Sequence, residues 1–271
     1  MFRDLKIGFI GGGNMGEALI RGLVSASLLN PQQIFVYDVI EGRLKYVQQQ
    51  YGVQLSPNSS TLAENCGLII LAVKPQTVDR VLDTIHSHLA HKPLVISIAA
   101  GISLATLAAG LPDKLPIIRV MPNTPALVQQ GASALARGHY ASDANMELAL
   151  TLFAAVGKAV EVEEKWMDAV TGLSGSGPAY ILLLLESLID AGVLVGLPRT
   201  TARELVVQTA LGTAIMLAQS DKHPGDLKDM ITSPGGTTIH GLQVLEEHGV
   251  RGAIMAAVNA ATHRSMELGK K

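Results

Sequence analysis

Two hydrophobic patterns divide the sequence at about residue 165. Before that point, short apolar runs alternate with amphipathic stretches, which is typical of buried strands alternating with helices. The runs that predict strands are residues 7–10, 33–37, 68–73, 94–100, 117–121, 132–136 and 159–162. The stretches that predict helices are residues 18–23, 42–50, 76–88, a short segment from 103, and 142–155. This alternation predicts an α/β fold built on a doubly wound parallel sheet.

Beyond residue 165 only helical periodicity remains. The predicted helices are residues 165–171, 177–195, 199–219, 224–231, 237–248 and 250–268. We therefore expect two domains, residues 1–164 with the sheet and residues 165–271 with helices alone. The helix at 177–195 is apolar around most of its circumference, and such a helix needs burial on every side. A partner subunit could cover it, which would make this domain a homodimer interface, or it could be the central helix of its own bundle.

The first predicted strand leads into Gly11, Gly13 and Gly16, which have the G-x-G-x-x-G spacing. A strand, this turn and a helix together are typical of a Rossmann-type dinucleotide-binding domain. The first glycine can take the tight turn, the second lets a pyrophosphate approach the backbone, and the third lets helix and strand pack closely. The start of the helix would offer free N–H groups to the phosphates. A structural strand-to-helix turn without a ligand is the alternative.

The end of the second predicted strand carries two side chains that favour different cofactors. Asp38 lies ~20 residues after Gly16, where a carboxylate can accept hydrogen bonds from the ribose hydroxyls of NAD. Arg43 follows it and could pair with the 2′-phosphate of NADP. Asp38 could also be an N-cap or turn residue without a ligand. The sequence leaves the choice between NADH and NADPH open.

Three further segments follow predicted strands, at residues 72–75, 99–101 and 121–125. The carboxyl ends of parallel strands face the ligand crevice of such a sheet. We therefore expect these segments to line one cleft beside the glycine turn.

A second motif lies in the helical region, where residues 233–239 read Ser-Pro-Gly-Gly-Thr-Thr-Ile and lead into an amphipathic helix. Glycines and hydroxyls at a helix start can bind a small carboxylate through free N–H groups and short hydroxyl donors. A well-capped loop is the alternative, because Ser and Thr are ordinary caps. Another Gly/Ser-rich segment, residues 172–178, could be a close-packing interface or a substrate loop.

Composition and missing motifs narrow the function classes. The net charge of −2, with one Trp, five Tyr and four Phe, gives no reason to expect a nucleic-acid partner. Cys66 is the only cysteine, and no paired His/Cys ligand spacing occurs, so we expect no disulfide and no metal. Glu186 and Asp190 interrupt the most apolar window, which argues against a membrane span. The N-terminus shows no signal-peptide pattern, so we expect a cytoplasmic location.

With both motifs in view, the chain resembles the pyrroline-5-carboxylate reductase family over nearly its whole length. The most specific part is residues 233–239, together with His-Pro-Gly at 223–225 and Leu-Lys-Asp at 227–229. The supporting segments are residues 9–15, 72–75, 99–101, 121–125 and 173–180.

The resemblance implies reduction of L-1-pyrroline-5-carboxylate to L-proline with NADPH or NADH, by a dinucleotide domain followed by a helical dimerisation domain. Dimers of this family commonly assemble further, into decamers. The substrate carboxylate would lie on the turn formed by Ser233, Gly235, Gly236 and Thr237, and the catalytic Thr238 would hydrogen-bond the ring nitrogen. The cofactor-binding residues that the resemblance implies are Ile10, Gly11, Gly12, Gly13, Asn14, Met15, Asp38, Asn58, Ala72, Val73, Lys74, Pro75, Ile98, Ala99 and Ala100. The spacing and strand-end arguments above add Gly16, Arg43 and Asn123.

One departure from the family pattern bears on the cofactor. Members that prefer NADPH usually carry a small polar residue where this chain has Asp38.

Two rival interpretations of the function also remain. One is a β-hydroxyacid dehydrogenase on the same two-domain plan, with Lys165 or Lys228 as its catalytic lysine, and the other is a sensor that binds NAD(P)H without turnover.

Overall fold

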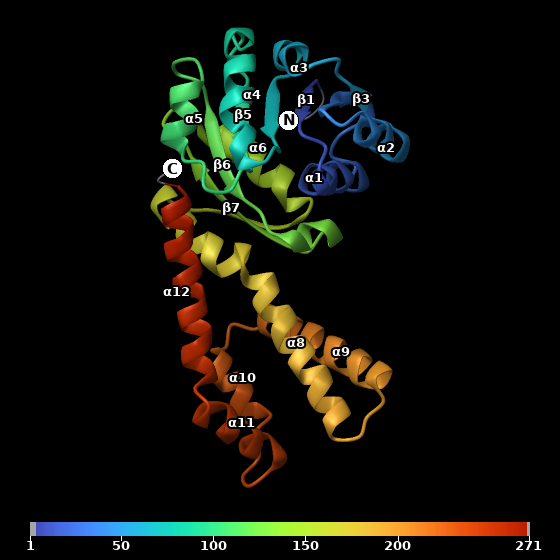
Figure 1. Cartoon of the computed structure of the whole chain (residues 1–271), viewed down its shortest axis with the longest axis vertical. Helices are drawn as coiled ribbons and strands as arrows, with labels where there is room; N and C mark the ends of the chain where they lie inside the picture. The colour runs from blue at the N-terminus through green and yellow to red at the C-terminus, as the bar shows by residue number, and fades with distance from the viewer. Residues whose placement is uncertain (1–3, 270–271) are drawn as a thin grey trace. The chain divides into compact units, whose positions relative to one another are not determined.

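The computed structural model describes residues 4–269, and its contacts divide the chain into two compact units (Figure 1). The first unit contains the described residues up to Ser176 and those from Ala260 onward. The second unit is Gly177–Asn259, inserted between these two parts of the first.

An eight-stranded sheet forms the centre of the first unit, in the order β3-β2-β1-β4-β5-β6-β7-β8. The strands are β1 Ile7–Ile10, β2 Ile34–Tyr37, β3 Gln54–Leu55, β4 Leu68–Leu71, β5 Leu94–Ser97, β6 Ile117–Met121, β7 Gly131–Arg137 and β8 Gly157–Glu161. Strands β1 to β6 are parallel, as predicted. The prediction of a wholly parallel sheet is wrong for the last two, because β7 runs antiparallel to β6 and β8 follows β7.

The connections explain this reversal. Between β6 and β7 the chain has only the short 3₁₀ turn η4, Thr124–Val128, and a short connection joins antiparallel neighbours. Between β7 and β8 it has the helix α6, Asp143–Ala154, which is long enough to cross over and restore a parallel pairing. The predicted helix at 142–155 is confirmed, and Ser142 caps it by accepting a hydrogen bond from the Asn145 amide at 3.2 Å.

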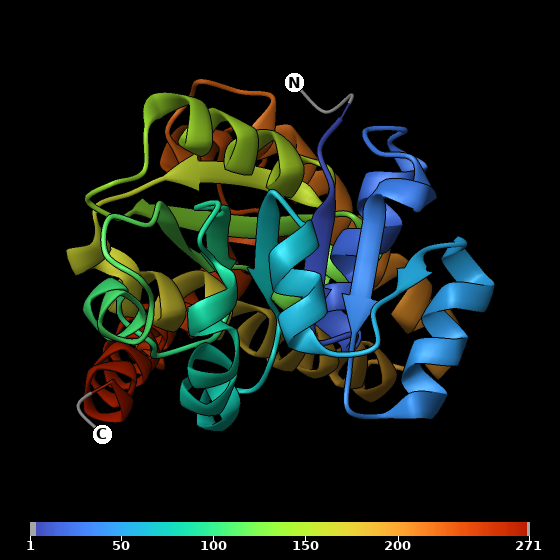
Figure 2. The same cartoon turned by 90° about the horizontal axis from the view of Figure 1, so that it is seen from above.

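Helices lie on both sides of the sheet (Figure 2). Besides α6 they are α1 Asn14–Ser25, α2 Glu41–Tyr51, α3 Ser59–Asn65, α4 Val78–Ile85, α5 Leu104–Gly110 and α7 Met167–Val170, with 3₁₀ turns η1 Pro31–Gln33, η2 Pro75–Thr77, η3 His86–His88 and η5 Glu164–Trp166 and the π-turn η6 Thr171–Gly175. Apolar side chains of α1 and α6 pack on one face of the sheet, and those of α3, α4 and α5 pack on the other. Strands β4 and β5 are therefore buried on both faces, which explains their continuous apolar runs.

The predicted domain boundary at residue 165 differs from the division by contacts, which falls after Ser176. The segment from 164 onward packs on the sheet unit because Glu164 accepts hydrogen bonds from the Leu104 amide at 2.6 Å and from Arg119 at 3.2 Å. The Ser265 hydroxyl near the chain's end donates to Asp168 at 2.6 Å in the same unit. The boundary at 164/165 stays a prediction of where the second domain begins.

The second unit is all-helical, as predicted. Its helices are α8 Gly177–Leu194, α9 Arg199–Ala218, α10 Pro224–Met230 and α11 Thr237–Glu247, with the first part of α12 Val250–Leu268. Helix α8 contains no buried residue, and Leu182 on it is 65% exposed. The alternative in which α8 is the buried centre of its own bundle is therefore wrong for the single chain.

Candidate cofactor site and substrate loop

The glycine turn has the geometry that its spacing predicts. Gly11 adopts a φ of +106°, and a Cβ there would lie 2.4 Å from the Ala72 carbonyl oxygen. A Cβ on Gly16 would lie 2.5 Å from the Gly11 carbonyl oxygen. A Cβ on Gly13 would meet no protein atom within 4 Å, so the space in front of this exposed residue is open. Two of the glycines are thus required by the chain's own packing, while the third leaves room for a ligand.

The start of α1 faces this open space without a cap. Gly13 is its N-cap residue, and among residues 4–269 no side chain caps the first amides of the helix. Unpaired amides at a helix start carry partial positive charge and bind phosphate groups. The turn and the helix start therefore fit a dinucleotide pyrophosphate.

The ends of four parallel strands meet beside this turn. The Gly11 amide donates to the Tyr37 carbonyl at 2.8 Å, and the Ala72 amide donates to the Ile10 carbonyl at 2.9 Å. The Ile98 amide donates in turn to the Leu71 carbonyl at 3.1 Å. The segments after β4 and β5 therefore lie along the same sheet edge as the glycine turn, as predicted. A hollow of about 580 Å³ opens at this edge, and Pro75 and Ala100 are among its lining residues.

Asn123 in the segment after β6 has a role that the sequence did not indicate. Its side-chain oxygen accepts a hydrogen bond from the Ala132 amide at 2.8 Å, and its side-chain nitrogen donates to the Ser174 carbonyl at 3.0 Å. Ser174 lies in the π-turn η6, and π-turns occur frequently at functional sites. Asn123 thus ties the end of β6 to this turn, and its contact with a cofactor stays a prediction.

Asp38 lies at the end of β2 and holds the glycine turn. Its carboxylate accepts hydrogen bonds from the Gly12 amide at 2.7 Å and from the Ile40 amide at 2.9 Å. The N-cap of α2 is Ile40, so the N-cap alternative for Asp38 is wrong, while the turn role is confirmed. Each carboxylate oxygen keeps a further lone pair, so this turn role is compatible with accepting from a ribose hydroxyl.

Arg43 is held by neighbouring groups of the chain. Its guanidinium donates to the Gly12 carbonyl and to the Glu17 carboxylate on α1. Tyr51 also donates to Glu17, at 2.7 Å. Burial tends to raise the pKa of Glu17, but the hydrogen bonds from Tyr51 and Arg43 outweigh it and hold this pKa below the usual range. Burial and the hydrogen bond to Glu17 raise the pKa of Tyr51 to about 12.

Asn58 lies in the short connection between β3, which pairs with β2, and α3. Its side-chain oxygen accepts a hydrogen bond from the Thr61 amide at 2.7 Å, which makes it the N-cap of α3. The side chain is exposed, and its assignment to the adenosine side of a cofactor stays a prediction.

In the second unit, residues 233–236 form a turn at the start of α11. The Gly236 amide donates to the Ser233 carbonyl at 3.1 Å, and Gly235 adopts a φ of +66°. A Cβ on Gly236 would lie 2.3 Å from the Ser233 hydroxyl oxygen, so a side chain there would displace that hydroxyl from its present position. Gly236 is the N-cap of α11, and no side chain in the described part of the chain caps the first amides, including that of Thr237. The alternative of a well-capped loop is therefore wrong, and the unpaired N–H groups at the start of α11 can donate to an anion.

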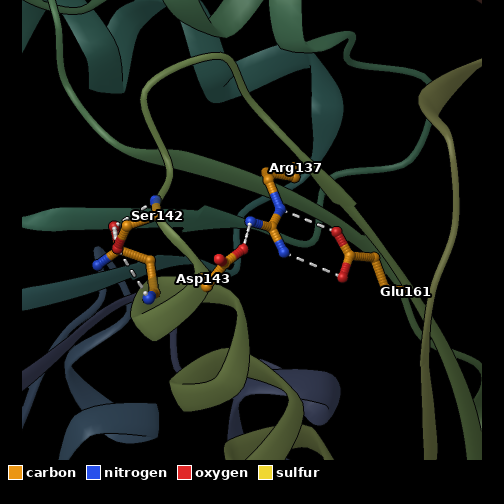
Figure 3. Close-up of polar contacts among 5 residues, drawn as sticks. Arg137, Ser142, Asp143 and Glu161 are labelled. Atoms are coloured by element: carbon orange, nitrogen blue, oxygen red, sulfur yellow. Dashed lines mark hydrogen bonds and ion pairs between the residues drawn. The ribbon is translucent and has the colours of Figure 1, made fainter.

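A prominent ion-pair cluster lies elsewhere and has a structural role (Figure 3). Arg137 on β7 makes two hydrogen bonds with Glu161 on β8, at 2.8 and 3.1 Å, and it also pairs with Asp143 at the start of α6. The hydrogen bonds that Arg137 donates to Glu161 and Asp143 raise the pKa of its guanidinium. Strand β7 is antiparallel to β6, and Arg137 lies opposite Ile118, near the start of β6. The cluster therefore lies at the amino ends of the parallel strands, whereas the glycine turn lies at their carboxyl ends.

Cys66 gives no sign of redox or metal chemistry. The residue is fully buried in the core beneath α3, and burial raises the pKa of its thiol to about 12. This confirms the expectation of a small apolar core residue. Within residues 4–269, no group of three His, Cys, Asp or Glu side chains is arranged to hold a metal ion.

Comparison with known families matches both parts of the chain. The family model for pyrroline-5-carboxylate reductase dimerisation matches residues 164–268. The model for NADP oxidoreductase, coenzyme F420-dependent, matches residues 6–101. The first match begins at the predicted domain boundary and includes the turn before α11, and the second includes the glycine turn and the ends of β2, β4 and β5.

Full-length relatives give the same result. The pyrroline-5-carboxylate reductase of Synechocystis sp. is 48% identical, over 99% of this chain and all of the relative. The enzyme of the same name from Methanosarcina acetivorans is 47% identical over 98% of both chains. Among solved structures, the reductase of Coxiella burnetii superposes with a TM-score of 0.94 at 35% identity, over 98% of this chain and 99% of the other. That of Plasmodium falciparum, which has NADP bound, superposes with a TM-score of 0.89 at 35% identity, over 99% and 100%. The chain therefore belongs to the pyrroline-5-carboxylate reductase family of NAD(P)H-dependent oxidoreductases.

Proposed function

We propose that this chain reduces L-1-pyrroline-5-carboxylate to L-proline with NADPH or NADH at the residues that the sequence singled out. One observation carries the assignment: the chain has both an open glycine turn at the sheet edge and an uncapped Ser-Pro-Gly-Gly turn before α11. The first fits a dinucleotide and the second fits a small carboxylate, and the reaction needs both ligands.

The cofactor would be held by the first unit. The uncapped amides of α1 would bind the pyrophosphate in the open space at Gly13, and Asp38 would accept from the adenosine ribose. The segments Ala72–Pro75 and Ile98–Ala100 lie along the same sheet edge and would position the rest of the molecule. When bound, the reduced cofactor would supply a hydride to the imine carbon of the substrate.

The substrate would be held by the turn before α11. Ser233, Gly235, Gly236 and Thr237 would bind its carboxylate, through the Ser233 hydroxyl and the free amides of the helix start. Thr238 would hydrogen-bond the ring nitrogen. Because this nitrogen can arrive protonated, the site needs no strong general acid. Orientation then carries most of the rate enhancement, and well-aligned reactants can gain about 7–11 kcal/mol from it.

The helical unit would form a homodimer in the cytoplasm. Helix α8 exposes a row of large apolar side chains, and a partner subunit would remove them from water. The helical run Glu164–Leu194 is also long and apolar enough to cross a membrane by length and composition, a test that helices buried in soluble proteins pass too. Its position within the matched dimerisation family favours the dimer. Further assembly of dimers into a decamer is part of the same proposal.

The decisive assay follows the loss of reduced-nicotinamide absorbance with purified protein, pyrroline-5-carboxylate and either NADH or NADPH. We expect turnover with at least one cofactor. Turnover with hydroxyacids instead would establish the rival dehydrogenase, although Lys165 is exposed and paired with Glu163 at 2.7 Å rather than placed in a site. Cofactor binding with no turnover of either substrate class would establish the sensor and overturn the proposal.

A further inference from the structure

A third residue, which the sequence did not single out, contacts one of the two side chains that favour different cofactors. Asp38 and Arg43 favour different cofactors, but the Arg43 guanidinium is already hydrogen-bonded to other groups of the chain. Glu17, one turn into α1, accepts a hydrogen bond from the Arg43 guanidinium, and the two charged groups form an ion pair. The three residues surround Gly12, whose amide binds Asp38 and whose carbonyl binds Arg43.

The Glu17–Arg43 pair is well supported. Only 24% of the Arg43 side chain and 17% of the Glu17 side chain are exposed to solvent. Tyr51 donates to the other carboxylate oxygen of Glu17 at 2.7 Å and fixes its orientation. The Arg43 guanidinium also lies over the Tyr46 ring, 5.0 Å from its centroid. Contacts with the backbone, a carboxylate and a ring therefore direct Arg43 toward α1.

This arrangement opposes a 2′-phosphate. Such a group carries close to two negative charges at neutral pH and would take the place of the ribose 2′-hydroxyl that Asp38 is proposed to bind. It would approach one carboxylate directly, and it could recruit Arg43 only in competition with the second carboxylate, that of Glu17. Rejection of a competitor by unfavourable charges is a usual source of specificity.

We infer that Glu17 determines cofactor choice in this protein, and that by holding Arg43 it makes the chain select NADH over NADPH. The inference rests on the proposed function, because it concerns the same cofactor site. Its expected size is a dissociation constant for NADH at least about tenfold below that for NADPH. A tenfold ratio corresponds to about 1.4 kcal/mol.

The test measures binding by isothermal titration calorimetry, with the full chain, no substrate, and NADH and NADPH in turn. In Glu17→Gln the side chain keeps its shape but loses the charge that holds Arg43. We expect the dissociation constant for NADPH to fall about tenfold, with that for NADH changed less than about threefold. Glu41→Gln is the matched control, because Glu41 lies at the start of α2 near Arg43 but pairs with Lys45 at 2.7 Å. It removes the same charge and should leave the NADH/NADPH ratio within about twofold.

A second variant keeps the inference testable if Glu17→Gln does not fold. Arg43→Ala should weaken binding of both cofactors by the same factor, because Arg43 supports the Gly12 turn that both would use. A selective loss of NADPH binding in Arg43→Ala would show that Arg43 already serves the 2′-phosphate, and would overturn the inference. The same follows if the wild-type protein prefers NADPH, if folded Glu17→Gln keeps the wild-type ratio, or if Glu41→Gln shifts it equally.

Failure of the proposed function would look different. No binding of either cofactor would overturn the site itself, and the selectivity inference with it. Binding of NADH without turnover of pyrroline-5-carboxylate would overturn the reaction and leave the selectivity intact.

Discussion

The glycine turn allows one substitution to be compared at two positions with opposite expected effects. Gly11→Val places a β-branched side chain at a φ of +106°, with its Cβ 2.4 Å from a backbone oxygen of Ala72. Backbone strain of this kind costs about 1–3 kcal/mol and overpacking about 1–3 kcal/mol more. We therefore expect Gly11→Val to lower the free energy of unfolding by at least about 2 kcal/mol. In a protein of this size that lowers the melting temperature by at least about 4–8 °C.

Gly13→Val should behave in the opposite way. A Cβ at Gly13 meets no protein atom within 4 Å, and the residue has an ordinary φ of −65°. The melting temperature should therefore stay within about 2–4 °C of the wild type, since a poorer N-cap residue costs about 1 kcal/mol or less. The new side chain would instead fill the space proposed for the pyrophosphate, and NAD(P)H binding should be abolished.

The assay is a thermal melt of both variants beside a calorimetric titration with NADH and NADPH. Each variant is the control for the other, because both add the same side chain to the same turn. Normal cofactor binding by Gly13→Val would refute the dinucleotide interpretation of the turn. Wild-type stability of Gly11→Val would refute the packing argument.

Three further predictions test the turn before α11, the sheet unit and the dimer. Thr238→Val should lower kcat/KM by roughly ten- to 150-fold, because a hydrogen bond to a charged group contributes about 1.5–3 kcal/mol. Unchanged kinetics would remove this residue from the mechanism. Glu164→Ala should lower the free energy of unfolding by about 1–3 kcal/mol in denaturant melts, because it leaves a largely buried guanidinium and a backbone amide without a partner. Glu163→Ala, which breaks only an exposed pair, should change it by less than about 1 kcal/mol, and equal losses would contradict the assignment. Leu182→Glu on the exposed face of α8 should convert a dimer to monomers in sedimentation velocity, whereas Val39→Glu, at a similarly exposed apolar position in the sheet unit, should not. A Leu182→Glu dimer would place the interface elsewhere.

The strands and helices that the sequence predicts are those with strong local patterns. Strand β4 is a continuous apolar run, and β1, β5 and β6 are mostly apolar, because helices cover both faces of the sheet. No helix or strand was predicted between residues 51 and 67, a segment that contains the two-residue strand β3 and the seven-residue helix α3. Elements this short have too few residues to show a period. The direction of β7 also escaped prediction, because an apolar run has no polarity and only the shortness of the connection after β6 reverses it.

The candidate site divides in the same way between local and distant contacts. The glycine turn could be predicted because a strand, a turn and a helix are consecutive in the sequence. The double role of Asn123 could not, since one of its partners, Ser174, lies 51 residues away. The nearest sequence signal was the Gly/Ser-rich segment at 172–178, which indicated a special backbone but not what held it.

The Arg43 side chain shows why cofactor choice in particular needs the folded structure. From sequence alone its proximity to Asp38 favours a 2′-phosphate contact, because a cation that follows the second strand has no other obvious partner. In the fold, α1 brings Glu17 to the same place from 26 residues away, and the cation's donors go to that carboxylate and to Gly12. A residue type at the right position therefore has the capacity to bind a phosphate only if the rest of the chain leaves it free. Substitution of Glu17, which touches Arg43, is consequently a sharper test of this pocket than substitution of Arg43 or Asp38, because it changes the competition and leaves both groups in place.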